Sequence, residues 1–537
     1  MNTAIILGAS VALFALAYRY HSPWISRRLG VQPHRPTPAH TMRDDVDYCP
    51  AKAPVLFGHH FASIAGAAPI VGPIVAATYG WLPVLLWIVL GGIFLGSVHD
   101  FAALVASVHH RGLSIGEIIG RYVGRFGSRI FLFFLWATLV LLMAVFLVVV
   151  SKTFESAPSA STASTLFIGL ACAFGLAIYR FRLPLGVATV AGVAVLAACM
   201  AAGWAWPLAL AERTWISLLI AYIVLAAVLP VWLLLQPRDF LNSFLLYALI
   251  AAGAVGVLAA GGVASYPAYV AWFDPKLGAL FPILFVTVAC GAISGFHSIV
   301  ASGTTAKQLD RESEARPVGY GAMLLESLLA LIALIVVMRM GRADYLDRIS
   351  AAGPVAIFSD GIGAMLGALG VPQARGAEFA ALAVSAFVLT TLDTATRLGR
   401  FALQELFAPR KGAAHNIVSG NRYVATILTV AAAGALAYSG KWKMIWPIFG
   451  AANQLLAAIA LLAVSIWLKR AGGKSAFLRI PMFAMFAITL SALGVIIHKD
   501  LSAGNFALAS ISAALLALAV TLVWESIRSV RRANTNQ

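Results

Sequence analysis

Long runs of apolar residues, separated by short polar segments, follow one another from the start of the chain almost to its end. Since about 20 apolar residues span a bilayer as a helix, about fifteen segments are candidate transmembrane helices. They lie at residues 3–18, 55–79, 83–108, 130–150, 164–179, 185–206, 215–235, 243–264, 280–303, 318–338, 377–396, 423–438, 445–467, 481–497 and 503–524. Only 11% of the residues are charged. The pattern predicts an all-α polytopic membrane protein.

Basic residues are distributed unevenly among the segments that connect these spans. With the N-terminus outside, most of the 38 Lys and Arg residues lie on the cytoplasmic side, as the positive-inside rule requires. The apolar stretch from Gly353 to Gly370 is not counted as a span, because counting it would turn the basic loop from Arg397 to Arg422 outward. We therefore expect residues 339–376 to form an outer loop with a surface helix, and the C-terminus to be cytoplasmic. The formal net charge of +17 then needs no nucleic-acid partner.

One expected cytoplasmic loop has an amphipathic pattern of its own. Ser114 and Glu117 have the spacing of a capping box, and apolar residues from Ile115 to Phe126 share one helical face. Arg residues follow at every fourth position. The pattern predicts a short helix that lies on the cytoplasmic leaflet of the membrane.

The candidate span at residues 55–79 contains the segment GHHFASIAGAAPIVGP, from Gly58 to Pro73. Glycine and proline interrupt it repeatedly, so we expect a broken helix. Broken backbone at membrane depth is tolerated only where it is buried in protein or lines a cavity. A break also leaves free N–H groups that attract a carboxylate and free carbonyls that attract a cation. The segment is therefore the first candidate for a binding site.

Ionisable residues within the spans form a second group of candidates, because their burial in a membrane is costly. His99 and Asp100 are neighbours in one span and could take up and release a proton together. Glu326 lies inside a later span. Asp393 lies near the inner end of its span, close to Arg397, and is interpreted either as a salt-bridge partner of that arginine or as an ion-coupling residue. A structural hydrogen-bonded pair remains the alternative for His99 and Asp100.

Eight ordered segments resemble the carbon-starvation protein A (CstA) family of bacterial inner-membrane transporters. They are Tyr18 to Tyr20 with the following arm, GHHFASIAGAAPIVGP, GSVHDFAALVAS from Gly96, LPVWLLLQPRDFLNSF from Leu229, SGFHSIVASGTT from Ser294, YGAMLLES from Tyr320, TTLDTATRLGRFALQEL from Thr390 and WPIFGAANQLLA from Trp446. The resemblance implies uptake of peptides or small carboxylates such as pyruvate under carbon starvation, a stress response, by a symporter with alternating access. It also implies coupling to H+ or Na+, no cofactor, and a site in the bacterial inner membrane. The chain is shorter than the larger members of the family.

The family is also similar to the amino-acid, polyamine and organocation superfamily, which implies two inverted five-helix repeats. If the span at 55–79 opens the first repeat, the span at 215–235 opens the second in the opposite direction, and Pro230 interrupts it. The expected organisation is an anchor helix and cytoplasmic arm (1–54), the first repeat (55–206), the second repeat (207–400), and four additional helices with a basic tail (401–537).

The two expected breaks predict the substrate-binding residues. These are Ala65, Gly66, Ala67, Pro69, Gly72, Trp232 and Gln236. The resemblance further implies that hydroxyl groups of the span at 280–303 contribute to a sodium site. Ser294 and Ser298 share a helical face there and are candidates for it, although close helix packing explains small residues equally well.

Two other classes of function stay open at this point. His59, His60, His99 and His297 fall in or beside spans and could ligate haem or a transition metal in a membrane redox enzyme. A passive channel is the other alternative. The partners expected are a small-molecule or peptide substrate and the lipid bilayer, and the sequence leaves the oligomeric state open.

Overall fold

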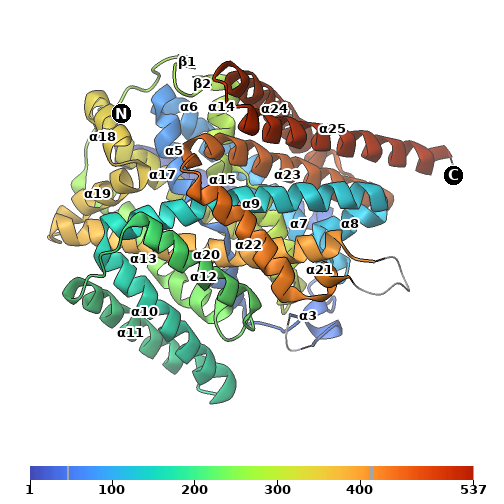
Figure 1. Cartoon of the computed structure of the whole chain (residues 1–537), viewed down its shortest axis with the longest axis horizontal. Helices are drawn as coiled ribbons and strands as arrows, with labels where there is room; N and C mark the ends of the chain where they lie inside the picture. The colour runs from blue at the N-terminus through green and yellow to red at the C-terminus, as the bar shows by residue number, and fades with distance from the viewer. Residues whose placement is uncertain (45–46, 410–415, 536–537) are drawn as a thin grey trace.

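The computed structural model describes residues 1–44, 47–409 and 416–535. Those residues are helical almost throughout, and one two-stranded antiparallel sheet, β1 (Phe273–Asp274) with β2 (Gly278–Ala279), lies in a connection (Figure 1). The middle of the basic loop expected between Arg397 and Arg422, residues 410–415, and the last two residues of the basic tail lie outside the described residues.

The helices of the first half are α1 (Thr3–Leu16), α2 (Ser22–Leu29), α3 (Pro38–Thr41), α4 (Ala53–Ile64), α5 (Ala68–Ala76), α6 (Trp81–Leu86), α7 (Ser97–His109), α8 (Ile115–Tyr122), α9 (Arg125–Ser156), α10 (Pro158–Gly175), α11 (Leu185–Ala205), α12 (Glu212–Val228) and α13 (Leu235–Ala260). The helices of the second half are α14 (Leu280–Thr287), α15 (Ala289–Ala292), α16 (Gly295–Gly303), α17 (Ala322–Met338), α18 (Arg342–Ala351), α19 (Pro354–Gly367), α20 (Gln373–Leu406), α21 (Ile417–Gly420), α22 (Arg422–Tyr438), α23 (Trp442–Arg470), α24 (Ala476–Ser502) and α25 (Phe506–Thr535). Short 3-10 or π-helical turns extend or connect several of them: η1 (Ala17–His21), η2 (Ala77–Tyr79), η3 (Trp87–Gly96), η4 (Leu176–Arg180), η5 (Thr305–Lys307), η6 (Glu312–Glu314) and η7 (Arg316–Gly321).

Eleven of the described helical segments are long and apolar enough to cross a membrane, or up to 12 if the bent pair α4–α5 is one span. The other three of the fifteen expected spans fall short of that measure. Helices α12 and α22 have 17 residues each, and residues 280–303 are divided among α14, α15 and α16. Apolar runs in the sequence show neither a helix end nor a break, so counting them overestimates the continuous spans. The outer segment expected at 339–376 contains α18 and α19, which are both shorter than a span.

Two long helices organise the interior. Helix α9 has 32 residues and α20 has 34, and they pack against each other with α12 and α22 alongside. Helices α10 and α11 form a hairpin that projects from the rest at the lower left of Figure 1, while α24 and α25 lie on the opposite side. Exposed Val187 and Val190 on α11 suit contact with lipid.

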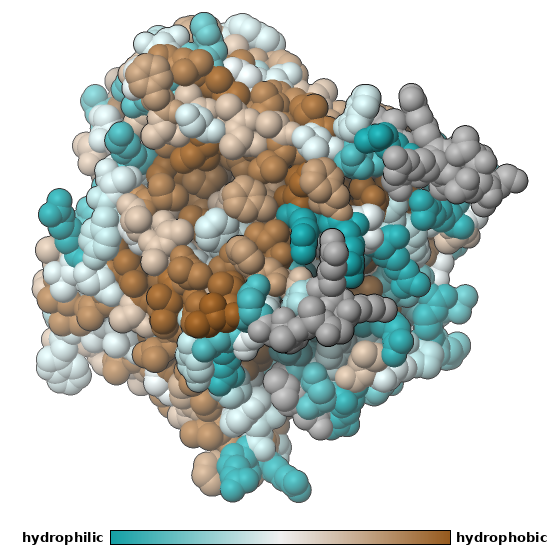
Figure 2. Space-filling model, turned by 45° about the vertical axis from the view of Figure 1, so that its right-hand side comes forward, coloured by the Kyte–Doolittle hydropathy of each residue, from teal (hydrophilic) through white to brown (hydrophobic). Residues whose placement is uncertain are grey.

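The surface agrees with a protein that lies in a membrane. Figure 2 shows hydrophobic residues across much of one face and hydrophilic residues concentrated at its right-hand side. The predicted amphipathic helix is α8, but it ends at Tyr122, and Phe126, which was expected on the same helical face, belongs to α9. Ser114 caps α8 through the N–H of Glu117, and the Glu117 carboxylate accepts from the N–H of Ser114 at 3.1 Å.

The segment between α2 and α4 forms a strap across one end of the helices. Ala51 pairs with Leu309 in a parallel bridge, and the Ala51 N–H donates to the Gln308 carbonyl at 2.9 Å. Arg35 contacts both His109 and Glu312, whose carboxylate also lies 2.6 Å from the His109 ring. These contacts tie the strap to the end of α7 and to the connection before α17.

Candidate functional site

The first broken helix lies where the sequence predicts it. Helix α4 ends at Ile64, α5 begins at Ala68, and the segments on either side of the break are bent by 42°. The N–H of Gly66 turns back to the carbonyl of Ile64 at 2.9 Å instead of continuing the helical ladder. Pro69 has no N–H to restore that ladder. Thus the ends of two half-helices meet inside the protein.

A second broken helix occupies residues 280–303. Ile293 and Ser294 are extended between α15 and α16, with φ near −163° and −137°. Asn453 of α23 supports this break: its side-chain oxygen accepts from the Phe296 N–H at 2.8 Å, and its amide nitrogen donates to Ser294 Oγ at 3.0 Å. The second break was instead expected at 215–235, and the small residues near Ser294 were interpreted either as a sodium site or as contacts of close helix packing.

The segment at 215–235 is a junction between two helices rather than a broken span. Helix α12 ends at Val228, Pro230 lies in the connection, and α13 begins at Leu235. The expected position of the second break was therefore wrong. Proline marks an irregular backbone, but only tertiary contacts distinguish a break within a span from a turn between two helices.

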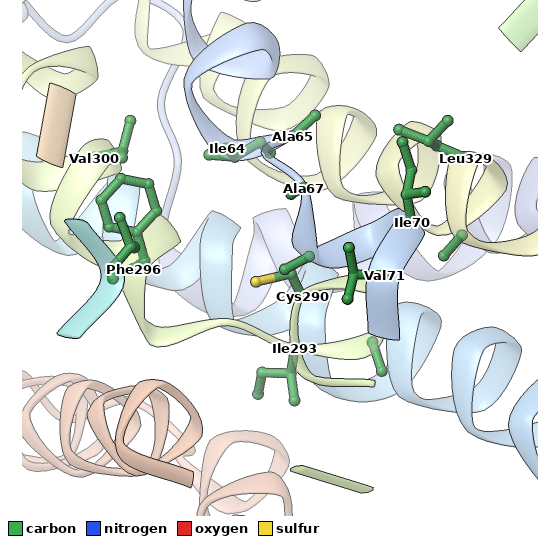
Figure 3. Close-up of a cluster of buried hydrophobic side chains, with 14 of the residues drawn as sticks. Ile64, Ala65, Ala67, Ile70, Val71, Cys290, Ile293, Phe296, Val300 and Leu329 are labelled. Carbon is green, nitrogen blue, oxygen red and sulfur yellow. The ribbon is translucent and has the colours of Figure 1, made fainter. Parts of the chain in front are cut away.

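The two broken helices lie against each other, because α5, which follows the first break, packs against α14 and α15, which precede the second. A Cβ atom on Gly72 would lie 2.6 Å from the carbonyl oxygen of Thr287 and 3.1 Å from Cα of Val288. In Figure 3, Ala67 and Val71 beside the first break lie next to Cys290, which precedes the second. The side chains between the breaks are mainly small and apolar, and they are fully or almost fully buried. This crossing contains Ala65, Gly66, Ala67, Pro69 and Gly72, five of the predicted substrate residues.

The remaining two predicted substrate residues lie elsewhere. Gln236 accepts a hydrogen bond from Tyr179 at 2.6 Å and donates to Gln308 at 3.2 Å. The ring of Trp232 lies 5.9 Å from that of Tyr179. Gln236 and Tyr179 line a separate cavity of about 330 Å³ beside Lys52 at the start of α4. Trp232 and Gln236 are thus not brought to the crossing of the two breaks.

Four buried ionisable residues form what we call the imidazole–carboxylate cluster: His99 and Asp100 of α7, His297 of α16 and Glu326 of α17. Asp100 lies 2.7 Å from Nδ1 of His99 and 2.8 Å from Nδ1 of His297. The other ring nitrogen of His297 lies 3.3 Å from a Glu326 carboxylate oxygen. His99 and Asp100 were predicted as a pair, whereas the recruitment of His297 and Glu326 depends on the packing of three helices.

Several atoms of this cluster have unused hydrogen-bonding capacity. Within the described residues, Nε2 of His99, Nε2 of His297 and both oxygens of Glu326 have no partner with hydrogen-bond geometry. Buried polar atoms are usually satisfied, so exceptions indicate a functional constraint or an absent ligand. Among the described residues, the group with ligand atoms close enough for a metal ion is Cys290, His297 and Glu326, within 4.8 Å of one another.

Asp393 forms its ion pair with Arg238 of α13 rather than with Arg397. Tyr222 also donates to its carboxylate, at 2.5 Å. Arg397 donates to the carbonyls of Ala226 and Leu229 at the end of α12. The expected pairing with nearby arginines was therefore wrong, because those side chains reach a helix end that is distant in sequence.

The other predicted residues have local partners. His59 lies 2.7 Å from Asp239, and His60 lies 2.8 Å from the Thr305 hydroxyl. Each therefore has a side-chain partner outside the proposed set of four histidine ligands. Ser298 donates to the carbonyl of Gly295 at 2.7 Å, while Ser294 is engaged by Asn453.

Comparisons with known proteins agree with a transporter. A family model described as "Carbon starvation protein CstA" matches residues 2–348 and 346–492. The peptide transporter CstA of Campylobacter jejuni is 33% identical over 542 residues, which cover 88% of this chain and 77% of that protein. The pyruvate/proton symporter BtsT of Escherichia coli is 33% identical over 546 residues, with 85% and 76% covered. The peptide transporter CstA of Bacillus subtilis is 34% identical over 513 residues, with 86% and 84% covered.

Among solved structures, a manganese transporter of Eremococcus coleocola has a TM-score of 0.48 and 13% sequence identity, covering 91% of this chain and 99% of that chain. The family match extends over most of the sequence and confirms the resemblance seen in its motifs. The protein therefore belongs to the CstA family of membrane transporters and is not the redox enzyme considered as an alternative.

Proposed function

We propose that the protein is a proton-driven symporter that imports a small carboxylate or a peptide by alternating access. The observation that carries the proposal is the crossing of two broken helices, α4–α5 and α14–α16, beside the imidazole–carboxylate cluster. Discontinuous helices near the membrane midplane are typical of substrate sites in secondary transporters.

The polarity of the breaks suits an anionic or zwitterionic substrate. Helix α5 presents its N-terminal end at the first break, and α16 presents its N-terminal end at the second. Helix N-termini favour carboxylates through the positive end of the helix dipole. Ala65, Gly66 and Ala67 at the first break have small side chains or none, so a ligand can approach the backbone closely there.

The imidazole–carboxylate cluster supplies the coupling site in this proposal. His297 lies between Asp100 and Glu326, and each of its two ring nitrogens faces one of them. Imidazole can therefore pass a proton between the two carboxylates. His297 also belongs to α16, directly after the second break, so protonation there is linked to the substrate site. One relative is named a pyruvate/proton symporter, which favours H+ over Na+.

Sodium coupling through Ser294 and Ser298 is less well supported. The Ser298 hydroxyl donates to the carbonyl of Gly295, and Ser294 is held by Asn453. Asp393 is paired with Arg238, so we assign it to the packing of α13 against α20 rather than to coupling.

We further propose two inverted repeats with bounds that differ from those expected from the sequence. Helix α13 packs against α4, α20 and α19, while α23 packs against α14, α9 and α8. These contacts correspond if α4–α13 is matched with α14–α23. The α10–α11 hairpin is then an insertion in the first repeat. The two helices of this hairpin add two spans to the distance along the chain between matched helices. That distance therefore stays an odd number of spans, and the two repeats run in opposite directions.

The cellular setting follows from the same proposal. Lys and Arg bias places the N-terminus outside and the C-terminus in the cytoplasm of a bacterial plasma membrane. The family description associates the chain with carbon starvation. Import of peptides or pyruvate would supply carbon under that condition.

Uptake by proteoliposomes tests the proposal. Purified protein is reconstituted and offered radiolabelled pyruvate or alanyl-alanine, with an inward proton gradient, an inward sodium gradient, or no gradient. We expect accumulation of one of the two substrates above equilibrium with the proton gradient and its abolition by a protonophore. Equilibration without accumulation would indicate a channel and refute symport. Uptake of neither substrate under any gradient would refute the proposed substrate class.

A further inference from the structure

A cavity of about 480 Å³ opens at the end of the molecule where α9 finishes and α19 begins. Its walls come from the last turns of α9, the start of α19 and the first turns of α20, and Trp442 borders it. Val71 and Val149 lie at its apolar end. Val71 is part of α5 and lies beside Cys290 in Figure 3. The cavity therefore ends against the first broken helix.

The start of α19 gives this cavity a site for an anion. The 14-residue helix has Gly353 as its N-cap, without a side-chain cap, and Pro354 in its first turn. The first N–H groups of a helix have no intrahelical partner and carry the positive end of the helix dipole. A ligand carboxylate can accept hydrogen bonds from N–H groups after Pro354.

A buried hydroxyl in the same cavity also lacks a partner. Ser359 is 5% exposed and lines the cavity. Its Oγ has no hydrogen-bond partner in the part of the chain that the structure describes. An unsatisfied buried hydroxyl is costly, so a polar ligand group beside it would be stabilised. This observation points to a ligand independently of the helix N-terminus.

The charges around the cavity leave one cation weakly engaged. Asp360 is paired with Arg348 at 2.6 Å, and Glu378 is paired with Arg375 at 3.3 Å. Both acidic side chains thus have basic partners. The carboxylate of Glu155, which also lines the cavity, accepts from the backbone N–H of Glu212 at 3.1 Å.

Lys152 is the basic side chain that lines this cavity among the described residues. Its ammonium nitrogen lies 3.9 Å from the Glu212 carboxylate, beyond hydrogen-bond distance, and 5.6 Å from the ring centre of Trp442. About half of the Lys152 side chain is exposed. It can turn toward an anion in the cavity without breaking a buried contact.

We infer that this cavity is an outer vestibule that captures the carboxylate of the substrate before the substrate reaches the crossing of the broken helices. Lys152 attracts the carboxylate, while Ser359 and the first N–H groups of α19 orient it. Trp442 offers an apolar surface to the remainder of the molecule. The ligand class is a small carboxylate, as in pyruvate or the C-terminus of a short peptide. The inference rests on the proposed transport function, because it assigns the first binding step of that function.

Uptake kinetics with Lys152→Gln and Ser359→Ala test the inference, using whichever of pyruvate and alanyl-alanine the wild-type protein accumulates. We expect Lys152→Gln to raise KM about five- to tenfold, since about 1.4 kcal/mol corresponds to a factor of ten, with little change in the maximal rate. Ser359→Ala is expected to raise KM about threefold. Lys441→Gln is the matched control, because Lys441 is an exposed lysine next to Trp442 that does not line the cavity.

The outcomes separate the inference from the proposed function. An unchanged KM in Lys152→Gln, or an equal rise in Lys441→Gln, would overturn the vestibule while leaving symport intact. No accumulation by the wild-type protein would instead remove the proposed function.

Thiol labelling gives a readout that does not depend on transport. Ala352 is exposed and lines the cavity, so Ala352→Cys can be modified by a membrane-impermeant reagent. Pyruvate or alanyl-alanine should slow this modification and should not slow that of Ser439→Cys, which lies outside the cavity. Equal labelling rates with and without both ligands would refute binding in the vestibule.

Discussion

Gly72→Ala tests the contact on which the proposed site depends. Gly72 lies in α5, and the added Cβ would lie 2.6 Å from the carbonyl oxygen of Thr287 and 3.1 Å from Cα of Val288. Ordinary contacts of such atoms lie at 3.4–4 Å. Both obstructing atoms are backbone atoms at the junction of α14 and α15, in the same broken helix as the second break, so no side-chain rotation relieves the overlap. The two broken helices must separate instead.

The expected cost can be compared with that of the same substitution in open space. Overpacking of a close-packed interior costs about 1–3 kcal/mol. Gly169→Ala in α10 is the matched control, because nothing lies within 4 Å of the position of its Cβ. Alanine there should be neutral or stabilising by up to about 1 kcal/mol through helix propensity. Because the gain in helix propensity is common to both positions, the two variants should differ in their free energy of unfolding by about 1–3 kcal/mol.

Two assays follow this pair of variants. Denaturant unfolding of the purified proteins in detergent measures stability, and proton-driven uptake in proteoliposomes measures transport. We expect Gly72→Ala to be less stable and to lose most of its transport rate, with Gly169→Ala close to wild type in both. If Gly72→Ala were as stable and as active as Gly169→Ala, the two breaks could not be in the contact described.

Three further predictions concern buried polar groups. Glu326→Gln should abolish accumulation driven by a proton gradient while retaining counterflow exchange of labelled substrate, because the amide cannot exchange a proton with His297 at 3.3 Å. Accumulation at the wild-type level would exclude Glu326 from coupling. Asp393→Ala should lower the free energy of unfolding by about 3–5 kcal/mol, because it leaves Arg238 buried without its carboxylate. In denaturant unfolding, the double variant Arg238→Leu with Asp393→Leu should recover much of this loss, and equal losses in the two proteins would refute this account. Burial lowers the pKa of His110 below its ordinary value of 6.5, so the folded state should lose stability as pH falls below that value. His110→Gln should reduce this loss, and parallel curves of stability against pH for the wild-type protein and the variant from pH 7 to 5 would contradict it.

The sequence predicted the first break correctly and misplaced the second for one physical reason. Around Gly66, the break is encoded locally, because glycine and proline weaken the helix within a few residues. The extended residues Ile293 and Ser294 have no proline beside them, and Asn453 stabilises them from more than 150 positions away in the chain. A contact of that kind leaves no local pattern. Gly291 and Gly295 were the available signal, and they are equally consistent with helix packing.

The ionisable residues likewise could be recognised from the local sequence, whereas their partners could not. Their rarity within apolar spans marked His99, Asp100, Glu326 and Asp393 as candidates before any fold was known. Partners could not be deduced, because a buried charge takes the complementary group that packing places beside it. Proximity in sequence favoured Arg397 for Asp393, while the structure supplies Arg238 from another helix.

Sequence patterns alone suffice to identify an all-helical membrane protein of the CstA family, with a broken helix at Gly58 to Pro73 and a few ionisable residues inside its spans. Hydropathy, helix-breaking residues and shared motifs are properties of short segments, and they survive without a fold. Packing in three dimensions sets which helix lies against the first broken helix, adds His297 and Glu326 to the cluster around Asp100, and forms the cavity that Val71 lines. Those features depend on contacts between helices far apart in the chain, and such contacts are set by the packing of the whole molecule.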